Sequence, residues 1–109
     1  MVNYSANLDM TFSALSDPTR RSIISRLAKG EISIMELASP FDMSLPAVSK
    51  HVRVLEKAGL LIRKKRGRVH YCRLNALPLR DAAQWLVFYQ QFWDAKLDAL
   101  ANFLEETSE

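Results

Sequence analysis

The segment from residue 44 to residue 74 constrains the fold most, because a helical pattern changes within a few residues to a hairpin pattern. Ser44 is a typical N-cap residue, and Pro46 falls in the first helical turn, where proline is tolerated. Gly59 supplies the left-handed residue that commonly ends a helix. Between these positions, apolar residues recur at helical spacing and predict one buried face, formed by Val48, Val52 and Leu55.

A basic hairpin follows this helix. Residues 60–65 and 68–74 are rich in side chains that favour extended structure, and Gly67 between them supplies the positive φ of a tight turn. The turn length is not fixed by the sequence, so the sheet face that each side chain occupies stays open. We call this hairpin, residues 60–74, the wing.

A short helix is predicted just before residue 44. Over residues 33–38, Ser33 is placed as N-cap and Glu36 follows in capping-box spacing. A tight connection over residues 39–43 then leads into the next helix. Two helices joined in this way form a helix-turn-helix, here over about residues 33–58.

Two further helices are predicted nearer the N-terminus. Residues 8–15 have apolar residues at helical spacing. A second helix begins after Asp17, which can accept hydrogen bonds from its first N–H groups, with Pro18 at the first helical position. Helices thus account for most of the N-terminal half.

The last third of the chain predicts one long helix, about residues 78–105. Its apolar side chains cover so much of the circumference that the helix must be buried on two sides. We expect one side to pack on its own domain and the other on a second copy of the chain. The residues expected at that dimer interface are Phe12, Leu86, Tyr89, Trp93, Leu97, Leu100 and Leu104.

Length and composition indicate a single globular domain over residues 1–109, with 49% apolar and 25% charged residues. The N-terminal stretch lacks the order of a secretory signal, and no stretch approaches the roughly 18 apolar residues of a membrane span. One cysteine cannot form an internal disulfide. We therefore expect a cytoplasmic protein that has no contact with the membrane.

Charge is strongly asymmetric along the chain. Residues 44–75 hold nine Lys or Arg against one acid, so the rest of the chain, whose total is +3, carries a net −5. Such asymmetry favours a polyanionic partner for one face.

Double-stranded DNA fits these two surfaces. The major groove is about 12 Å wide and accepts one helix, whose first residues meet base edges. The wing can lie along the phosphate backbone or enter the minor groove. The predicted DNA-binding residues of the helix are Ser44, Pro46, Ala47, Ser49, Lys50, His51 and Arg53, and those of the wing are Lys64, Lys65, Arg66 and Arg68.

A chemical site is harder to find. His70 and Cys72 are two residues apart on a predicted strand and could share a face, but a closed zinc site needs about four ligands. No nucleophile–base pair or paired-carboxylate arrangement can be argued, so we expect no enzyme, no cofactor and no metal. A metal- or redox-responsive switch through these two residues remains an alternative, as does a winged helix used for protein–protein assembly.

Three segments together resemble the ArsR/SmtB family of bacterial winged-helix repressors. They are FSALSDPTRRSIISRL (12–27), SLPAVSKHVRVLEKAGLL (44–61) and RGRVHYCRL (66–74). The resemblance implies a mainly α fold with a small β-hairpin, namely a winged helix-turn-helix with a long C-terminal dimerisation helix. It also implies a homodimer that binds an imperfect palindrome at a promoter and represses, usually until an effector lowers its affinity. The promoter could be that of its own gene, and the effector is unknown.

The chain departs from the metal sensors of that family. The segment that corresponds to their thiolate site, residues 36–42, has no Cys or His, and residues 80–100 have aspartates but no His. The resemblance therefore does not extend to arsenic, zinc or cadmium sensing.

Overall fold

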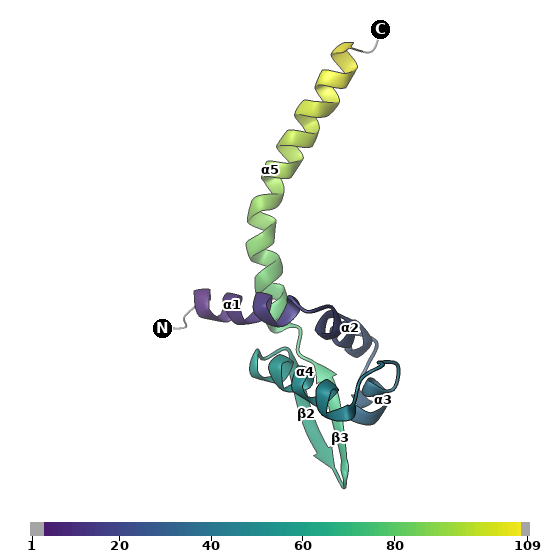
Figure 1. Cartoon of the computed structure of the whole chain (residues 1–109). Helices are drawn as coiled ribbons and strands as arrows, with labels where there is room; N and C mark the ends of the chain where they lie inside the picture. Colours follow the sequence, from purple (N-terminus) through teal and green to yellow (C-terminus); the bar gives the residue numbers. More distant parts are fainter. Residues whose placement is uncertain (1–3, 108–109) are drawn as a thin grey trace.

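The computed structural model describes residues 4–107, with side chains from residue 7 onward; residues 1–3 and 108–109 lie outside it, including the start of the stretch considered for a signal. Most of the described chain is helical, with one small sheet (Figure 1). The elements are, in order, α1 (Tyr4–Leu15), α2 (Pro18–Leu27), β1 (Ile32–Ser33), α3 (Ile34–Ala38), α4 (Leu45–Lys57), β2 (Leu61–Arg66), β3 (Val69–Leu74) and α5 (Leu77–Thr107).

The helix starts follow the capping pattern of the sequence. The Asp17 carboxylate accepts a hydrogen bond from the N–H of Arg20 at 3.1 Å, with Pro18 at the first position of α2. The Ser33 hydroxyl likewise accepts from the N–H of Glu36 at 3.2 Å. Both predicted caps are confirmed, whereas α1 begins at Tyr4, four residues before the expected start.

Helix α4 is built as the pattern predicts. The Ser44 hydroxyl accepts from the N–H of Ala47 at 3.2 Å, and Gly59, with φ of 80°, turns the chain toward β2. This left-handed conformation is one that glycine adopts at little cost. The predicted stripe is fully buried and forms the centre of the core, with Val48, Val52 and Leu55 packed against Ile23, Leu27, Leu37, Leu60, Leu61 and Cys72.

The sheet has the strand order β1-β3-β2, and both pairings are antiparallel. Arg66 pairs with Val69, so the turn of the wing is formed by Gly67 and Arg68 alone, and Arg68 is not the start of a strand as expected. Strand β1, whose Ile32 pairs with Cys72, was not predicted from the sequence. Two residues are too few to show a strand period.

Helix α5 departs from expectation in its surroundings. It has 31 residues and so is about 46 Å long, and it leaves the body of the protein almost at once (Figure 1). Only Ala82 is buried, and α1 is the element that packs against it. The expectation that one side of α5 packs on its own domain holds only near the start of the helix, where Ala82 is buried, because the body is too small to cover a helix of this length.

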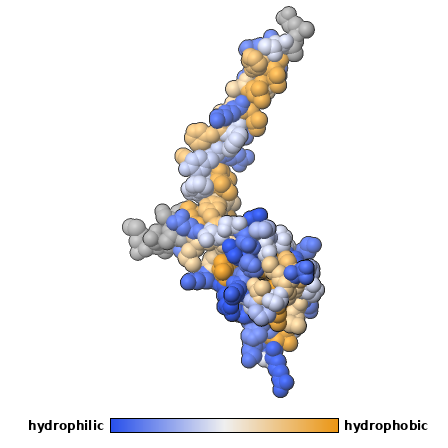
Figure 2. All heavy atoms as spheres, viewed as in Figure 1, coloured by the Kyte–Doolittle hydropathy of each residue, from blue (hydrophilic) through white to orange (hydrophobic). Residues whose placement is uncertain are grey.

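The result is an elongated molecule of 69 × 39 × 21 Å with apolar side chains along α5 (Figure 2). Within residues 4–107, no helix combines the length and hydrophobicity that crossing a bilayer requires.

Candidate nucleic-acid interface

The outer face of α4 carries most of the side chains predicted to contact DNA. Ser44, Pro46, Lys50 and Arg53 are exposed, while the small residues Ala47 and Ser49 are half-buried beside them. The three buried residues of the stripe fix this orientation, because rotating α4 to bury the polar face would expose the core. The start of the helix therefore presents cations, hydroxyls and little bulk to the solvent.

His51 is placed differently from its predicted neighbours. Its side chain is 19% exposed, and its Nδ1 lies 3.2 Å from the guanidinium of Arg20 and 3.8 Å from the carboxylate of Asp17. Of the two roles that its helix position allows, contact with DNA and packing between helices, the ring takes the second in this structure. The sequence held no sign of this, since the partners lie 31 and 34 residues earlier.

Asp17, which lies beside Arg20 and His51, is ionised. The hydrogen bond from the N–H of Arg20 is the main cause that lowers its pKa, and the charge of Arg20 acts in the same direction, against partial desolvation. The carboxylate thus stays charged at neutral pH beside the junction of α1 and α2.

The wing carries the second group of predicted residues. Lys64, Lys65 and Arg68 are exposed, and Arg68 lies in the turn itself. Arg66 is also exposed, but it is engaged within the protein: its guanidinium lies 2.7 Å from the carboxylate of Glu31 and 5.1 Å from the centre of the Tyr71 ring. The wing therefore presents three cations outward and holds a fourth over Tyr71 of the middle strand, paired with Glu31.

One ion pair connects the wing to α4 and was not predicted. Arg63 of β2 donates to Glu56 at 2.8 Å, and this hydrogen bond raises the pKa of the guanidinium. Glu56 is the acid that stood alone among the nine cations of residues 44–75. Glu56 fixes the hairpin against the helix through Arg63, and Arg66 is paired with Glu31, so two of the nine cations have a carboxylate partner.

His70 and Cys72 lie on the inner face of β3. Cys72 is fully buried, and burial is the main cause that raises the pKa of its thiol. The Nδ1 atom of His70 is buried and has no hydrogen-bond partner among the described residues. Over residues 4–107, no group of three or more His, Cys, Asp or Glu side chains is arranged to hold a metal ion.

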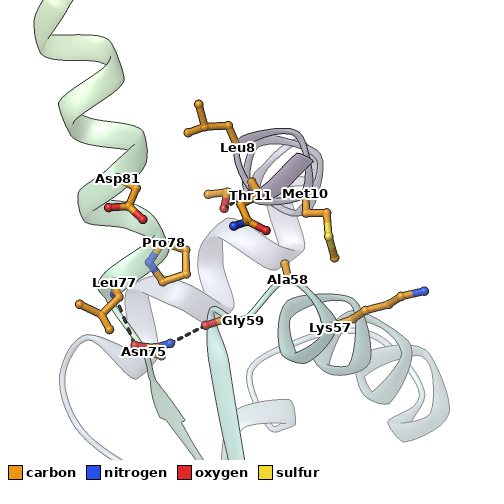
Figure 3. A pocket seen from close by; sticks show the side chains of 11 residues that line it. Leu8, Met10, Thr11, Lys57, Ala58, Gly59, Asn75, Leu77, Pro78 and Asp81 are labelled. Atoms are coloured by element: carbon orange, nitrogen blue, oxygen red, sulfur yellow. Dashed lines mark hydrogen bonds between the residues drawn. The ribbon is translucent and has the colours of Figure 1, made fainter. Parts of the chain in front are cut away.

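A hollow of about 340 Å³ marks the junction where α1, the end of α4 and the start of α5 meet (Figure 3). Asn75 organises this junction: its side-chain amide donates to the carbonyl of Gly59 at 2.8 Å, and its oxygen accepts from the N–H of Leu77 at 3.4 Å. Asn75 thus sets where α5 leaves the body. An Asn just before a predicted helix is the signal that could have identified it.

The residues predicted for dimerisation form an exposed apolar surface on α5 and α1. Phe12 of α1 packs edge-to-face on Trp85 at 5.6 Å between ring centres, and Trp85 in turn contacts Tyr89 at 4.9 Å. Farther along α5, more than half of each of the following side chains is exposed: Leu86, Trp93, Leu97, Leu100 and Leu104. Apolar area of this extent is rare on a monomer in water.

Comparisons with known proteins agree with this architecture. A family model for a helix-turn-helix domain matches residues 15–63. The transcriptional repressor SdpR of Bacillus subtilis is 32% identical over 80 residues, which span 73% of this chain and 89% of SdpR.

Solved structures extend the similarity to the fold. The crystal structure of the ArsR family transcriptional regulator RHA00566 has 40% sequence identity to this chain and a TM-score of 0.78, and the match covers 86% of this chain and 97% of that one. A homodimeric winged helix-turn-helix DNA-binding domain from Mycobacterium bovis, 23% identical over 91% of this chain and 93% of its own, shows the same fold with a TM-score of 0.62. The expected winged helix-turn-helix is therefore confirmed, and the chain belongs to the ArsR family of transcriptional regulators.

Proposed function

We propose that this protein is a homodimeric transcriptional repressor that binds a palindromic operator in the cytoplasm of a bacterium, with no catalytic activity. The observation that carries the proposal is the polarity of the molecule. The basic wing lies at one end and the apolar helix α5 extends from the other (Figures 1 and 2). One end is suited to a polyanion and the other to a second copy of the chain. Repression is the activity named for the relative SdpR.

Base reading is assigned to the start of α4. With the stripe turned inward, Lys50 and Arg53 can reach guanine acceptors or phosphates in the major groove. Ala47 and Ser49 are small enough for the helix to approach the base edges closely. Ser44, at the helix N-terminus, can hold a phosphate and fix the register.

Backbone contact is assigned to the wing. Lys64, Lys65 and Arg68 extend from the hairpin, with Arg68 at the turn, where it can enter a narrow minor groove. Such contacts add affinity and salt dependence without choosing a sequence. Because the guanidinium of Arg66 is paired with the carboxylate of Glu31, it would have to leave Glu31 before it could contact a DNA phosphate.

Dimerisation is assigned to α5 together with α1. Two copies of α5 packed about a two-fold axis would bury the aromatic surface and place two recognition helices on one side of the dimer. A two-fold symmetric protein reads a palindromic site, with its half-sites separated by whole turns of DNA.

Footprinting and gel shift on the DNA upstream of the protein's own gene test this proposal. We expect a protected region with two-fold symmetry and an affinity that falls steeply with salt, because several phosphates are neutralised per protomer. Affinity that does not change with salt would overturn DNA binding. A failure to shift this DNA at low salt, with an acidic protein co-purifying, would favour a role in protein–protein assembly.

A further inference from the structure

The side chain of Arg20 lies where three helices meet. Its Nε donates to the carbonyl of Ala14 at 2.6 Å, and one terminal nitrogen donates to the carbonyl of Ser13 at 3.2 Å. The other terminal nitrogen lies 3.2 Å from Nδ1 of His51. A residue at the start of α2 thus joins the end of α1 to the middle of α4.

The acceptors on α1 suit a guanidinium. Carbonyls in the last turn of a helix lack partners in the helix and carry the negative end of its dipole. Arginine presents its donors in a rigid fork, so it can bind these two carbonyls and a third acceptor at once. Lysine could satisfy one or two of them without fixing their relative positions.

The contact also sets the tautomer of His51. A guanidinium can only donate, so Nδ1 accepts and the ring N–H lies on Nε2. The charged groups that face the ring are Arg20 at 3.2 Å and Asp17 at 3.8 Å. The geometry therefore assigns His51 the Nε2–H tautomer.

Arg20 connects α1, which is assigned to dimerisation, with α4, which is assigned to DNA binding. The inference rests on that proposed function. Helix α1 packs against α5, through which the dimer would form. His51 lies on α4 between Lys50, which is exposed and is assigned to DNA under the proposed function, and Val52, which is buried in the core. A displacement of α1 relative to α4 must stretch or break the Arg20 contact.

We propose that Arg20 is a positioning residue that transmits the placement of the dimer-forming helices to the recognition helix through His51. In the dimer, it would hold the two α4 helices at the separation and tilt that match the operator. Its loss would affect how well the protein distinguishes the correct spacing of half-sites more than whether it folds or dimerises.

The test compares Arg20→Gln with Arg21→Gln. Arg21 also donates to the end of α1, to the carbonyl of Leu15 at 2.8 Å, and its hydrogen bond does not involve α4. Both changes remove one charge from the same helix turn. We expect Arg20→Gln to lower operator affinity roughly tenfold, the effect of losing the one of its three contacts that reaches α4, and to reduce discrimination against operators with one base pair inserted between half-sites. Arg21→Gln should leave that discrimination unchanged.

Variants of His51 separate positioning from direct contact. His51→Asn places an amide oxygen near Nδ1 and should retain the spacing preference, whereas His51→Leu should lose it as Arg20→Gln does. Dimer mass and thermal unfolding are measured for each variant. Equal spacing preference in Arg20→Gln and wild type, or loss of it in Arg21→Gln as well, would overturn the proposal.

Imidazole nitrogen NMR on the unbound protein gives a reading that does not depend on DNA. We expect His51 as the Nε2–H tautomer in wild type and as a mixture of tautomers in Arg20→Gln. Observation of the Nδ1–H tautomer in wild type would refute the Arg20 contact even if operator binding is confirmed. A protein that shows the expected tautomer but binds no DNA would instead refute the proposed function.

Discussion

The guanidinium of Arg66 lies 2.7 Å from the carboxylate of Glu31, which ties the end of β2 to the residue just before β1. The same guanidinium lies over the ring of Tyr71. Glu31 is therefore an acid beside the otherwise cationic wing, and it competes with DNA phosphate for one of the wing's cations. Arg66 was predicted from the sequence as a DNA contact, and the structure gives it a partner that must first be displaced.

Glu31→Gln should strengthen DNA binding several-fold and make its salt dependence steeper, because a freed Arg66 can neutralise one more phosphate. Each added phosphate contact changes the slope of log affinity against log salt by about −0.9. Glu36→Gln removes an exposed acid from α3 and controls for the change in net charge. The measurement is operator affinity over a salt series.

A double-mutant cycle tells the two explanations for Glu31 apart. If Glu31 acts by holding Arg66, its replacement should have no effect in an Arg66→Ala background. The same gain in both backgrounds would mean that Glu31 repels DNA directly and that its contact with Arg66 is irrelevant to binding.

Replacement of Lys50 or Ser49 by Ala should change which base is preferred at one operator position, by about 1–3 kcal/mol for a bidentate contact. Arg68→Ala should weaken binding to all DNA sequences alike. It should also reduce the slope of log affinity against log salt by about 1, as expected for the loss of a phosphate contact. Binding to a library of operator variants measures both effects. The reverse pattern would show that the helix and the wing exchange roles.

Leu97→Glu should convert the dimer to monomers, because it places a charge in the apolar surface of α5, where the side chain is now 59% exposed. Gln91→Glu adds the same charge on the polar side of the helix, about 120° around the axis from Leu97, and should leave the dimer intact. Light scattering gives the mass of each. An unchanged dimer in Leu97→Glu would remove this part of α5 from the interface.

The sequence predicted the local structure well, because short-range rules govern it. The caps at Ser33 and Ser44 and the buried stripe of α4 each depend on spacing within a few residues. Gly67 marked the turn of the wing correctly for the same reason. The residues predicted on the outer face of α4 are exposed or half-buried because the stripe fixes that orientation.

Features that depend on distant partners could not be predicted. The pairing of β1 with β3, the contact of Arg66 with Glu31 and the contact of His51 with Arg20 each join residues more than 30 positions apart. The prediction of what packs against α5 was incomplete for a related reason. Its apolar periodicity shows that the helix must be covered, and it does not show whether its own domain or another chain covers it.

The buried thiol of Cys72 gives the last prediction. Because burial raises the pKa of the Cys72 thiol above its ordinary value of 9.0, the folded state keeps its proton at a pH where the unfolded chain has lost it. Stability contributed by the neutral thiol is therefore fully present below pH 9.0 and declines as pH rises through the higher folded value. Cys72→Ala, which lacks the proton, should be less stable than wild type at pH 7 because it leaves a small cavity, and the difference should shrink at alkaline pH. Urea unfolding from pH 7 to pH 10 measures this difference in stability.

The protonated, buried thiol of Cys72 should also react slowly with iodoacetamide, and operator affinity should be the same for Cys72→Ala and wild type under oxidising conditions. Fast alkylation, or an oxidant that weakens binding only when Cys72 is present, would instead establish the redox-responsive switch that its place beside His70 allows.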